Sequence, residues 1–138
     1  MGIKRVSGKP FPEHERKAEG YLLLPAGLSG PAFIVTPNFF VLKEYNKSDL
    51  YALFVGHVGD RIQYGVADFA GKWGPVGGLL RSEVATMQRA LEGQGHAVGG
   101  ADGLAGFKTR RSIGRWQLAS GQSPTCFPEA NMKDVLIP

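Results

Sequence analysis

The chain has 138 residues, of which 43% are hydrophobic and 20% charged, and its formal net charge is +4. This length allows one ordinary domain or two small ones, because modules of about 60 residues can fold alone. A single cysteine excludes an intrachain disulfide and a multi-cysteine zinc site. With 20 Gly and 9 Pro residues, the chain should contain many turns and only short helices.

The N-terminal third is predicted to contain irregular chain followed by a hairpin. Residues 1–19 are polar and include Pro10 and Pro12, so we expect no regular element there. No apolar stretch of signal-peptide length follows the N-terminus, and neither an export signal nor a membrane span is predicted. The short apolar runs at 21–24 and 32–35 flank a loop rich in Gly and Pro, which favours a pair of strands.

Two helices separated by a break are predicted next. Thr36 and Pro37 provide an N-cap and a proline at the first helical position, and this helix should run to about Tyr45. Asn46 breaks it, and Ser48 can cap a second helix over residues 49–63. The apolar positions of that second helix recur at three- and four-residue steps along one face: Leu50, Leu53, Phe54, Val58 and Ile62.

The second half has its own pattern after a Gly-rich segment at 65–78, where we place a linker. Ser82 is expected to cap a helix that ends at Gly93 or Gly95, and Thr109 to cap one that reaches Ser120. Pro128 is expected to open a third, short helix. The predicted fold class is therefore mainly α with a small β-hairpin, and the second half is a three-helix bundle.

The break between the first two helices carries the candidate binding residues. Tyr45, Asn46, Ser48 and Tyr51 combine flat aromatic faces with hydrogen-bonding groups, which suits a polar ring such as a sugar. From local chemistry alone, the same residues also fit a helix break, an N-cap and core tyrosines. The stretch Tyr-Asn-x-Ser-x-x-Tyr-Ala resembles the last part of the catalytic domain of the lytic murein transglycosylase B family, where it lines the glycan cleft.

This resemblance implies a parent enzyme that cleaves the β-1,4 bond between MurNAc and GlcNAc and forms 1,6-anhydro-MurNAc. In the family, a single glutamate within a Glu-Ser pair is the general acid and then assists attack by the sugar's own hydroxyl. No Glu is followed by Ser in this sequence. The chain is therefore interpreted as a C-terminal fragment of such an enzyme, with no catalytic residue of its own and no activity alone.

The second half carries a second resemblance. Its quoted motifs occur in the order Met-Gln-Arg-Ala-Leu at 87–91, Gly-His-x-Val-Gly at 95–99, Asp-Gly-x-x-Gly-x-x-Thr at 102–109 and Ile-x-x-Trp-Gln at 113–117. This succession is similar to the three-helix peptidoglycan-binding domain at the ends of many wall hydrolases. The resemblance implies binding residues among Gln88, Asp102, Arg110 and Gln117. Each has a structural alternative, because helical glutamines are often solvated and Asp102 can simply shape its loop.

The domains expected from both resemblances are a catalytic-domain remnant at 1–64, a linker at 65–78 and a peptidoglycan-binding domain at 79–138. The expected partners are the glycan strands and peptide stems of peptidoglycan, and the expected location is the periplasm. Nucleic acid is not favoured as a partner, and no metal or cofactor is predicted. His14, His57 and His96 are widely separated and are interpreted as structural.

Two rival interpretations remain open from the sequence. One is a small basic adaptor that binds nucleic acid or protein through the cluster at 108–111, where Lys108, Arg110 and Arg111 lie. The other is an autonomous enzyme that uses Glu44 or Glu13 as its acid, although neither has an evidently shielded setting.

Overall fold

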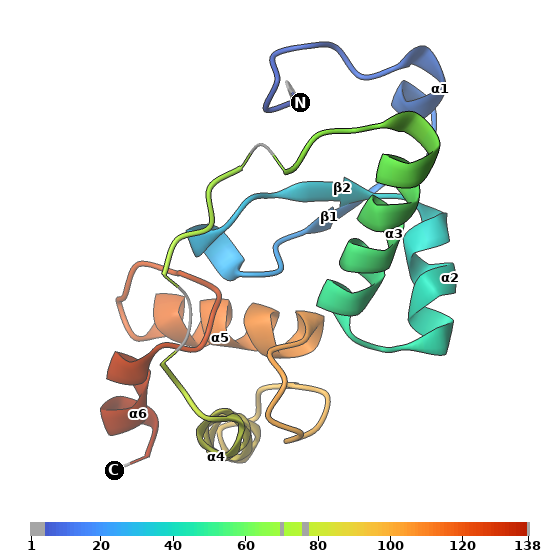
Figure 1. Ribbon diagram of the computed structural model, residues 1–138. Helices are drawn as coiled ribbons and strands as arrows, with labels where there is room; N and C mark the ends of the chain where they lie inside the picture. The colour runs from blue at the N-terminus through green and yellow to red at the C-terminus, as the bar shows by residue number, and fades with distance from the viewer. Residues whose placement is uncertain (1–4, 70, 76–77, 138) are drawn as a thin grey trace. The chain divides into compact units, whose positions relative to one another are not determined.

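The computed structural model describes residues 5–69, 71–75 and 78–137 (Figure 1). They form two compact units. Unit 1 consists of Met1–Leu23 with Ala32–Lys72, and unit 2 of Leu24–Pro31 with Trp73–Pro138. Helices predominate and one two-stranded hairpin is present, which confirms the predicted fold class. None of the helices that the described residues form is long and apolar enough to cross a bilayer.

Unit 1 contains the predicted hairpin. Strand β1 (Tyr21–Leu23) pairs with β2 (Phe33–Val35) in antiparallel register, with Leu22 opposite Ile34. A short helix α1 (Glu13–Arg16) precedes it, within the segment expected to be irregular. Glu13 forms ion pairs with Arg16 and Lys17 one turn away. These pairs and the preceding Pro12 favour a helical turn that the polar composition alone did not indicate.

Helices α2 (Pro37–Tyr45) and α3 (Asp49–Tyr64) complete unit 1 within one residue of the predicted bounds. Ser48 caps α3 as predicted, because its side chain accepts a hydrogen bond from the backbone N–H of Tyr51. Thr36 occupies the N-cap position of α2 but its side chain accepts no such bond. The buried core of the unit is Leu23, Val35, Phe39 and Ala52.

The apolar face of α3 differs from the prediction in how much of it is buried. Ala52 is fully buried and Leu53 is half-buried, but the exposed fractions of Leu50, Phe54 and Ile62 are 57%, 66% and 82%. A Cβ added to Gly56 would lie 3.6 Å from the Leu42 side chain. Gly56 of α3 therefore faces α2, and several large apolar side chains of α3 are exposed to solvent.

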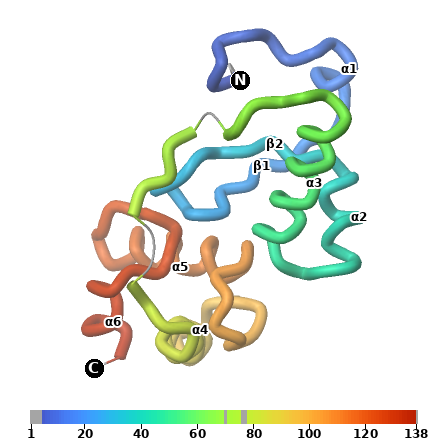
Figure 2. Tube along the Cα trace, viewed as in Figure 1, coloured from blue at the N-terminus to red at the C-terminus, as the bar shows by residue number. Residues whose placement is uncertain are grey.

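Unit 2 contains α4 (Arg81–Gly93), α5 (Phe107–Ala119) and α6 (Ala130–Leu136), whose path is easiest to follow in Figure 2. The three predicted helices are present. Their buried core is Met87, Leu91, Val98, Ile113, Trp116, Met132 and Leu136. A short 3-10 helix, η1 (Gly27–Ser29), also belongs to this unit.

The three helices of unit 2 begin at other residues than predicted. Helix α4 has Leu80 at its N-cap and not Ser82, and the Glu83 side chain accepts from the Leu80 N–H. Helix α5 begins at Phe107 after Gly106, so Thr109 lies inside it. Helix α6 begins two residues after Pro128. A hydroxyl is a weak start signal when a nearby carboxylate or tertiary partner satisfies the same donors.

Close backbone contacts hold the loop 24–31 in unit 2. The Leu28 N–H donates to the Thr125 carbonyl at 2.8 Å, and the Gly74 N–H donates to the Ser29 carbonyl at 2.6 Å. Gly27 has a φ of +58°, and a Cβ there would lie 2.2 Å from the Thr125 oxygen. Only glycine fits this position. The Trp73 ring lies against Gly30, which fastens the preceding segment to the same loop.

Candidate functional site

The turn between α2 and α3 brings together the four residues predicted to contact a sugar. Tyr45 is the last residue of α2, Asn46 follows it, Ser48 caps α3 and Tyr51 lies in the first turn of α3. The Asn46 Oδ1 accepts from the Ser48 N–H at 3.0 Å. The side-chain oxygens of Asn46 and Ser48 thus shape the turn, as predicted by the alternative in which these residues form a helix break and an N-cap.

The two tyrosines form an exposed aromatic surface at this turn. Tyr45 has an exposed fraction of 85%, so its ring does not close the core, which was one of its two interpretations. Its ring centroid lies 6.0 Å from that of Tyr51, with 32° between the ring planes. Tyr51 is half-buried. Paired rings with phenolic hydroxyls offer an apolar surface and polar tips, which is the combination that a sugar ring contacts.

An ion pair between the two helices holds this turn. The Lys43 ammonium, on α2, contacts the Asp49 carboxylate, on α3. Asp49 is only 8% exposed, and the Lys43 ammonium lies 6.0 Å from the centre of the Phe39 ring. A partly buried pair of this kind fixes the helix crossing more firmly than a solvated pair, because water screens it less. The aromatic surface therefore lies at the end of two helices that an ion pair joins.

Gln88, one of the four candidates in unit 2, is buried and its side chain is fully engaged. Its Nε2 donates to the Leu104 carbonyl and the Thr109 hydroxyl, both at 3.0 Å, and to Asp102 Oδ1 at 3.2 Å. Its Oε1 accepts from the Gly103 N–H at 2.7 Å. Gln88 thus fastens the loop at 99–106 to α4, and it is not the solvated helical glutamine that the structural alternative described.

Gln117 has a similar structural role, because its side chain joins α5 to the loop before α6. Its exposed fraction is 1%, its Oε1 accepts from the N–H groups of Thr125 and Cys126, and its Nε2 donates to the Thr125 hydroxyl. Arg110 is 6% exposed and donates to the Ala105 carbonyl at 2.6 Å. Of the four candidates in unit 2, only Asp102 is exposed. Their role in binding peptidoglycan stays a prediction.

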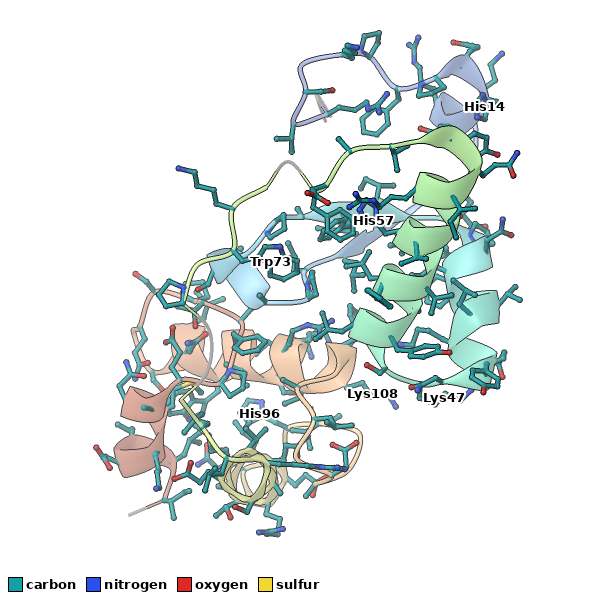
Figure 3. The ribbon with its side chains drawn as sticks, viewed as in Figure 1. His14, Lys47, His57, Trp73, His96 and Lys108 are labelled. Carbon is teal, nitrogen blue, oxygen red and sulfur yellow. The ribbon has the colours of Figure 1, made fainter. Side chains whose placement is uncertain are left out.

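Unit 1 also contains a groove that the sequence did not predict. It has a volume of about 410 Å³ and includes none of the four residues of the α2–α3 turn. Its walls come from the segment before β1, from β2, and from α2 and α3, and they include Glu15, Phe39 and His57. The His57 ring, labelled in Figure 3, stacks on Phe69 at a centroid distance of 4.0 Å. His57 lies in α3 and Phe69 lies beyond the end of that helix, so the helical period did not link them.

The two glutamates considered as catalytic acids are both solvated. The Glu44 side chain is 80% exposed and pairs with Lys47, and the Glu13 side chain is 66% exposed. A general acid at neutral pH needs a shielded setting that raises its pKa. Neither residue has one.

Comparison with known proteins shows what this arrangement is similar to. Residues 1–60 match the family described as Transglycosylase SLT domain. The solved structure of SltB3 from Pseudomonas aeruginosa in complex with NAG-anhNAM-pentapeptide matches all of this chain with 37% identity and a TM-score of 0.79. The SltB3 complex with NAG-NAM-pentapeptide matches 99% of the chain with 38% identity and the same TM-score. The chain is thus similar to the lytic transglycosylase SltB3 over its whole length. No curated protein matches it.

The two matches cover different sets of candidate residues. The transglycosylase match at 1–60 includes the whole α2–α3 turn, and the match to SltB3 also extends over unit 2. The chain spans 37% of the SltB3 chain. The aromatic turn therefore lies in the part with transglycosylase sequence character.

Proposed function

We propose that this chain binds peptidoglycan and does not cleave it. The observation that carries the proposal is the match to SltB3 over the whole chain, in structures where SltB3 holds NAG-anhNAM-pentapeptide or NAG-NAM-pentapeptide. The same proposal assigns the chain to the periplasm, where peptidoglycan lies.

The glycan contact is proposed to be at the α2–α3 turn. The exposed Tyr45 ring can stack on the apolar face of a sugar, and Tyr51 beside it extends the surface. Asn46 and Ser48 use their oxygens as acceptors within the turn. The Asn46 amide N–H groups and the Ser48 hydroxyl hydrogen have no acceptor among the described residues, so they can donate to sugar hydroxyls.

Unit 2 is proposed to be the peptidoglycan-binding module, with residues 1–64 as the remnant of a catalytic domain and 65–78 as the linker. The Gln88 and Gln117 networks support this role by fixing the loops of the bundle. Asp102 lies at the exposed edge of one network, where its Oδ1 accepts from the Leu104 N–H. A rigid bundle with short, fixed loops is a suitable scaffold for a polymer ligand.

The lytic reaction itself is proposed only for a longer parent protein. That reaction needs a shielded glutamate that first protonates the leaving oxygen and then assists attack by the sugar hydroxyl. In this chain no Glu-Ser pair occurs, and Glu13 and Glu44 are solvated. We expect no anhydro-sugar product when the purified chain is incubated with murein. Detection of 1,6-anhydro-MurNAc by mass spectrometry would contradict this part of the proposal.

The binding part is tested by retention of the purified chain on insoluble murein, with DNA-cellulose at matched salt for comparison. We expect retention on murein, and about fivefold weaker retention for Tyr45→Ala, because one stacking contact contributes about 1 kcal/mol. Tyr64→Ala is the matched control, since Tyr64 is 74% exposed but lies at the other end of α3. Retention of the wild-type chain on DNA only would favour the rival basic adaptor.

A further inference from the structure

The outward side of α5 carries three exposed basic residues, Lys108, Arg111 and Arg115, which we call the α5 basic face. Their spacing of three and four residues places them within about 60° of one another around the helix axis, over a length of about 10 Å. Figure 3 labels Lys108 near the start of α5. The exposed apolar side chains of Phe107 and Leu118 lie at the two ends of the same side.

The positive charge of the chain is concentrated on this helix. Residues 103–128 include four basic residues and no acidic residue, while the other 12 basic residues are matched by 12 acidic residues. The net charge of +4 thus comes from α5 alone. Arg110 is buried and donates to the Ala105 carbonyl. The other three basic residues of α5 are exposed to solvent. Among the described residues, none of these three forms an ion pair with a carboxylate.

Local contacts orient two of the three side chains. The Arg111 guanidinium lies over the Phe107 ring, 5.6 Å from its centre. The aliphatic part of Lys108 lies against Gly99, where a Cβ would approach its Cδ to 2.9 Å. Gly99 has a φ of +87°, so a glycine is favoured there and leaves room for the lysine stem. Charged groups whose stems are already packed lose less rotamer entropy when they bind an anion.

We propose that the α5 basic face binds carboxylates of the peptide stems of peptidoglycan, an assignment that rests on the proposed function. A guanidinium can form two parallel hydrogen bonds to one carboxylate, and Arg111 and Arg115 offer two such groups one turn apart. The length of about 10 Å fits a short peptide with several carboxylates. A nucleic acid duplex is a poorer fit, because a surface with three cations covers only a small part of its charged backbone.

The experiment measures retention of the full chain on native murein and on murein whose carboxylates have been converted to amides with a carbodiimide and glycinamide. We expect the wild-type chain to bind the amidated murein about tenfold more weakly, since three solvated ion pairs contribute modestly each. The variant Lys108→Gln/Arg111→Gln/Arg115→Gln should bind native murein about tenfold more weakly and show no further loss on amidated murein.

A variant with the same loss of charge serves as the control. Lys9→Gln/Lys17→Gln/Lys72→Gln removes three exposed lysines from unit 1 and should retain both the wild-type affinity and its dependence on carboxylates. Wild-type retention by the α5 variant, or an equal loss for both variants, would overturn the assignment but leave the proposed function standing. Loss of DNA retention with murein retention intact would assign the face to nucleic acid. No murein retention by the wild-type chain would overturn both proposals.

Discussion

Helix α3 in unit 1 and helix α4 in unit 2 both carry apolar residues at three- and four-residue steps, but these residues differ greatly in burial. On α4, Val84, Met87 and Leu91 are 8%, 1% and 0% exposed. On α3, Leu50, Phe54 and Ile62 are all more than half exposed. A period of 3.6 residues identifies which side chains share a face, but burial depends on whether another element covers that face. Unit 2 supplies that cover through α5 and α6, and unit 1 covers only part of α3.

The intrinsic tryptophan and tyrosine signals of the chain allow the stability of each unit to be measured separately. Both tryptophans, Trp73 and Trp116, belong to unit 2, and all four tyrosines lie in unit 1 at positions 21, 45, 51 and 64. Tryptophan fluorescence therefore reports the unfolding of unit 2, and tyrosine absorbance with a correction for tryptophan reports unit 1. The two signals can be followed in one urea titration.

The largest effect is expected for Leu91→Ala in the core of unit 2. Leu91 is fully buried, and removal of its side chain leaves a cavity, so the free energy of unfolding should fall by about 2–5 kcal/mol. The tryptophan transition should move to lower urea. Glu92→Ala, the exposed neighbour on α4, is the control and should change little. A change below 1 kcal/mol for Leu91→Ala would mean that this core is looser than its burial indicates.

Gln88→Ala should have the next largest effect, in the same unit. The substitution leaves the Gly103 N–H and the Leu104 carbonyl without their partner, which costs about 1–3 kcal/mol. It should also increase amide hydrogen exchange at Gly103. Arg89→Ala removes a neighbouring exposed side chain and is the matched control. Exchange at Gly103 that stays as slow as in the wild-type chain would argue against this network.

Ser48→Ala tests the turn that presents the tyrosines in unit 1. The loss of the N-cap bond to Tyr51 should cost about 1 kcal/mol, seen in the tyrosine signal and not in tryptophan fluorescence. Ser48→Asp should restore most of this stability, because its carboxylate can cap the same N–H. The exposed Lys47→Ala is the control. A shift of equal size in the tryptophan transition would show that the two units unfold together.

A smaller, pH-dependent effect is expected at the contact between α4 and α6. The Lys133 ammonium donates to the Glu83 carboxylate, and this bond with that from the Leu80 N–H lowers the pKa of Glu83 below its usual 4.5. The stabilisation is present above pH 4.5 and is lost as the pH falls through the lowered pKa. Tryptophan-monitored unfolding of the wild-type chain and Glu83→Gln should differ at pH 6 and converge in acid. A constant difference at every pH would exclude this linkage.

The smallest effect is expected for Phe54→Ser on the exposed side of α3. Phe54 is 66% exposed, so the free energy of unfolding should change by no more than about 0.5 kcal/mol. Phe39→Ser is the contrast, because Phe39 is 8% exposed within the core of unit 1. A cost above about 1 kcal/mol for Phe54→Ser would mean that this face is covered in solution, and the comparison between α3 and α4 would then fail.

The sequence was sufficient for the features that depend on neighbours along the chain. The hairpin, helices α2 and α3 of unit 1 and the three helices of unit 2 were predicted from periodicity, proline placement and short-range capping, whereas α1 was not. Ser48 and Asn46 took their predicted turn roles, because their partners lie two or three residues away. The motifs also identified the transglycosylase relationship, which the comparisons confirm.

Only the tertiary structure decided which polar residues are exposed. Gln88, Arg110 and Gln117 looked like surface residues, but partners up to 21 positions away satisfy the Gln88 amide and the others are buried as well. Arg115 was not singled out, yet it shares the exposed side of α5 with Lys108 and Arg111. The physical reason is that helix periodicity is a local property, whereas burial and the pairing of polar groups depend on segments that meet only after folding.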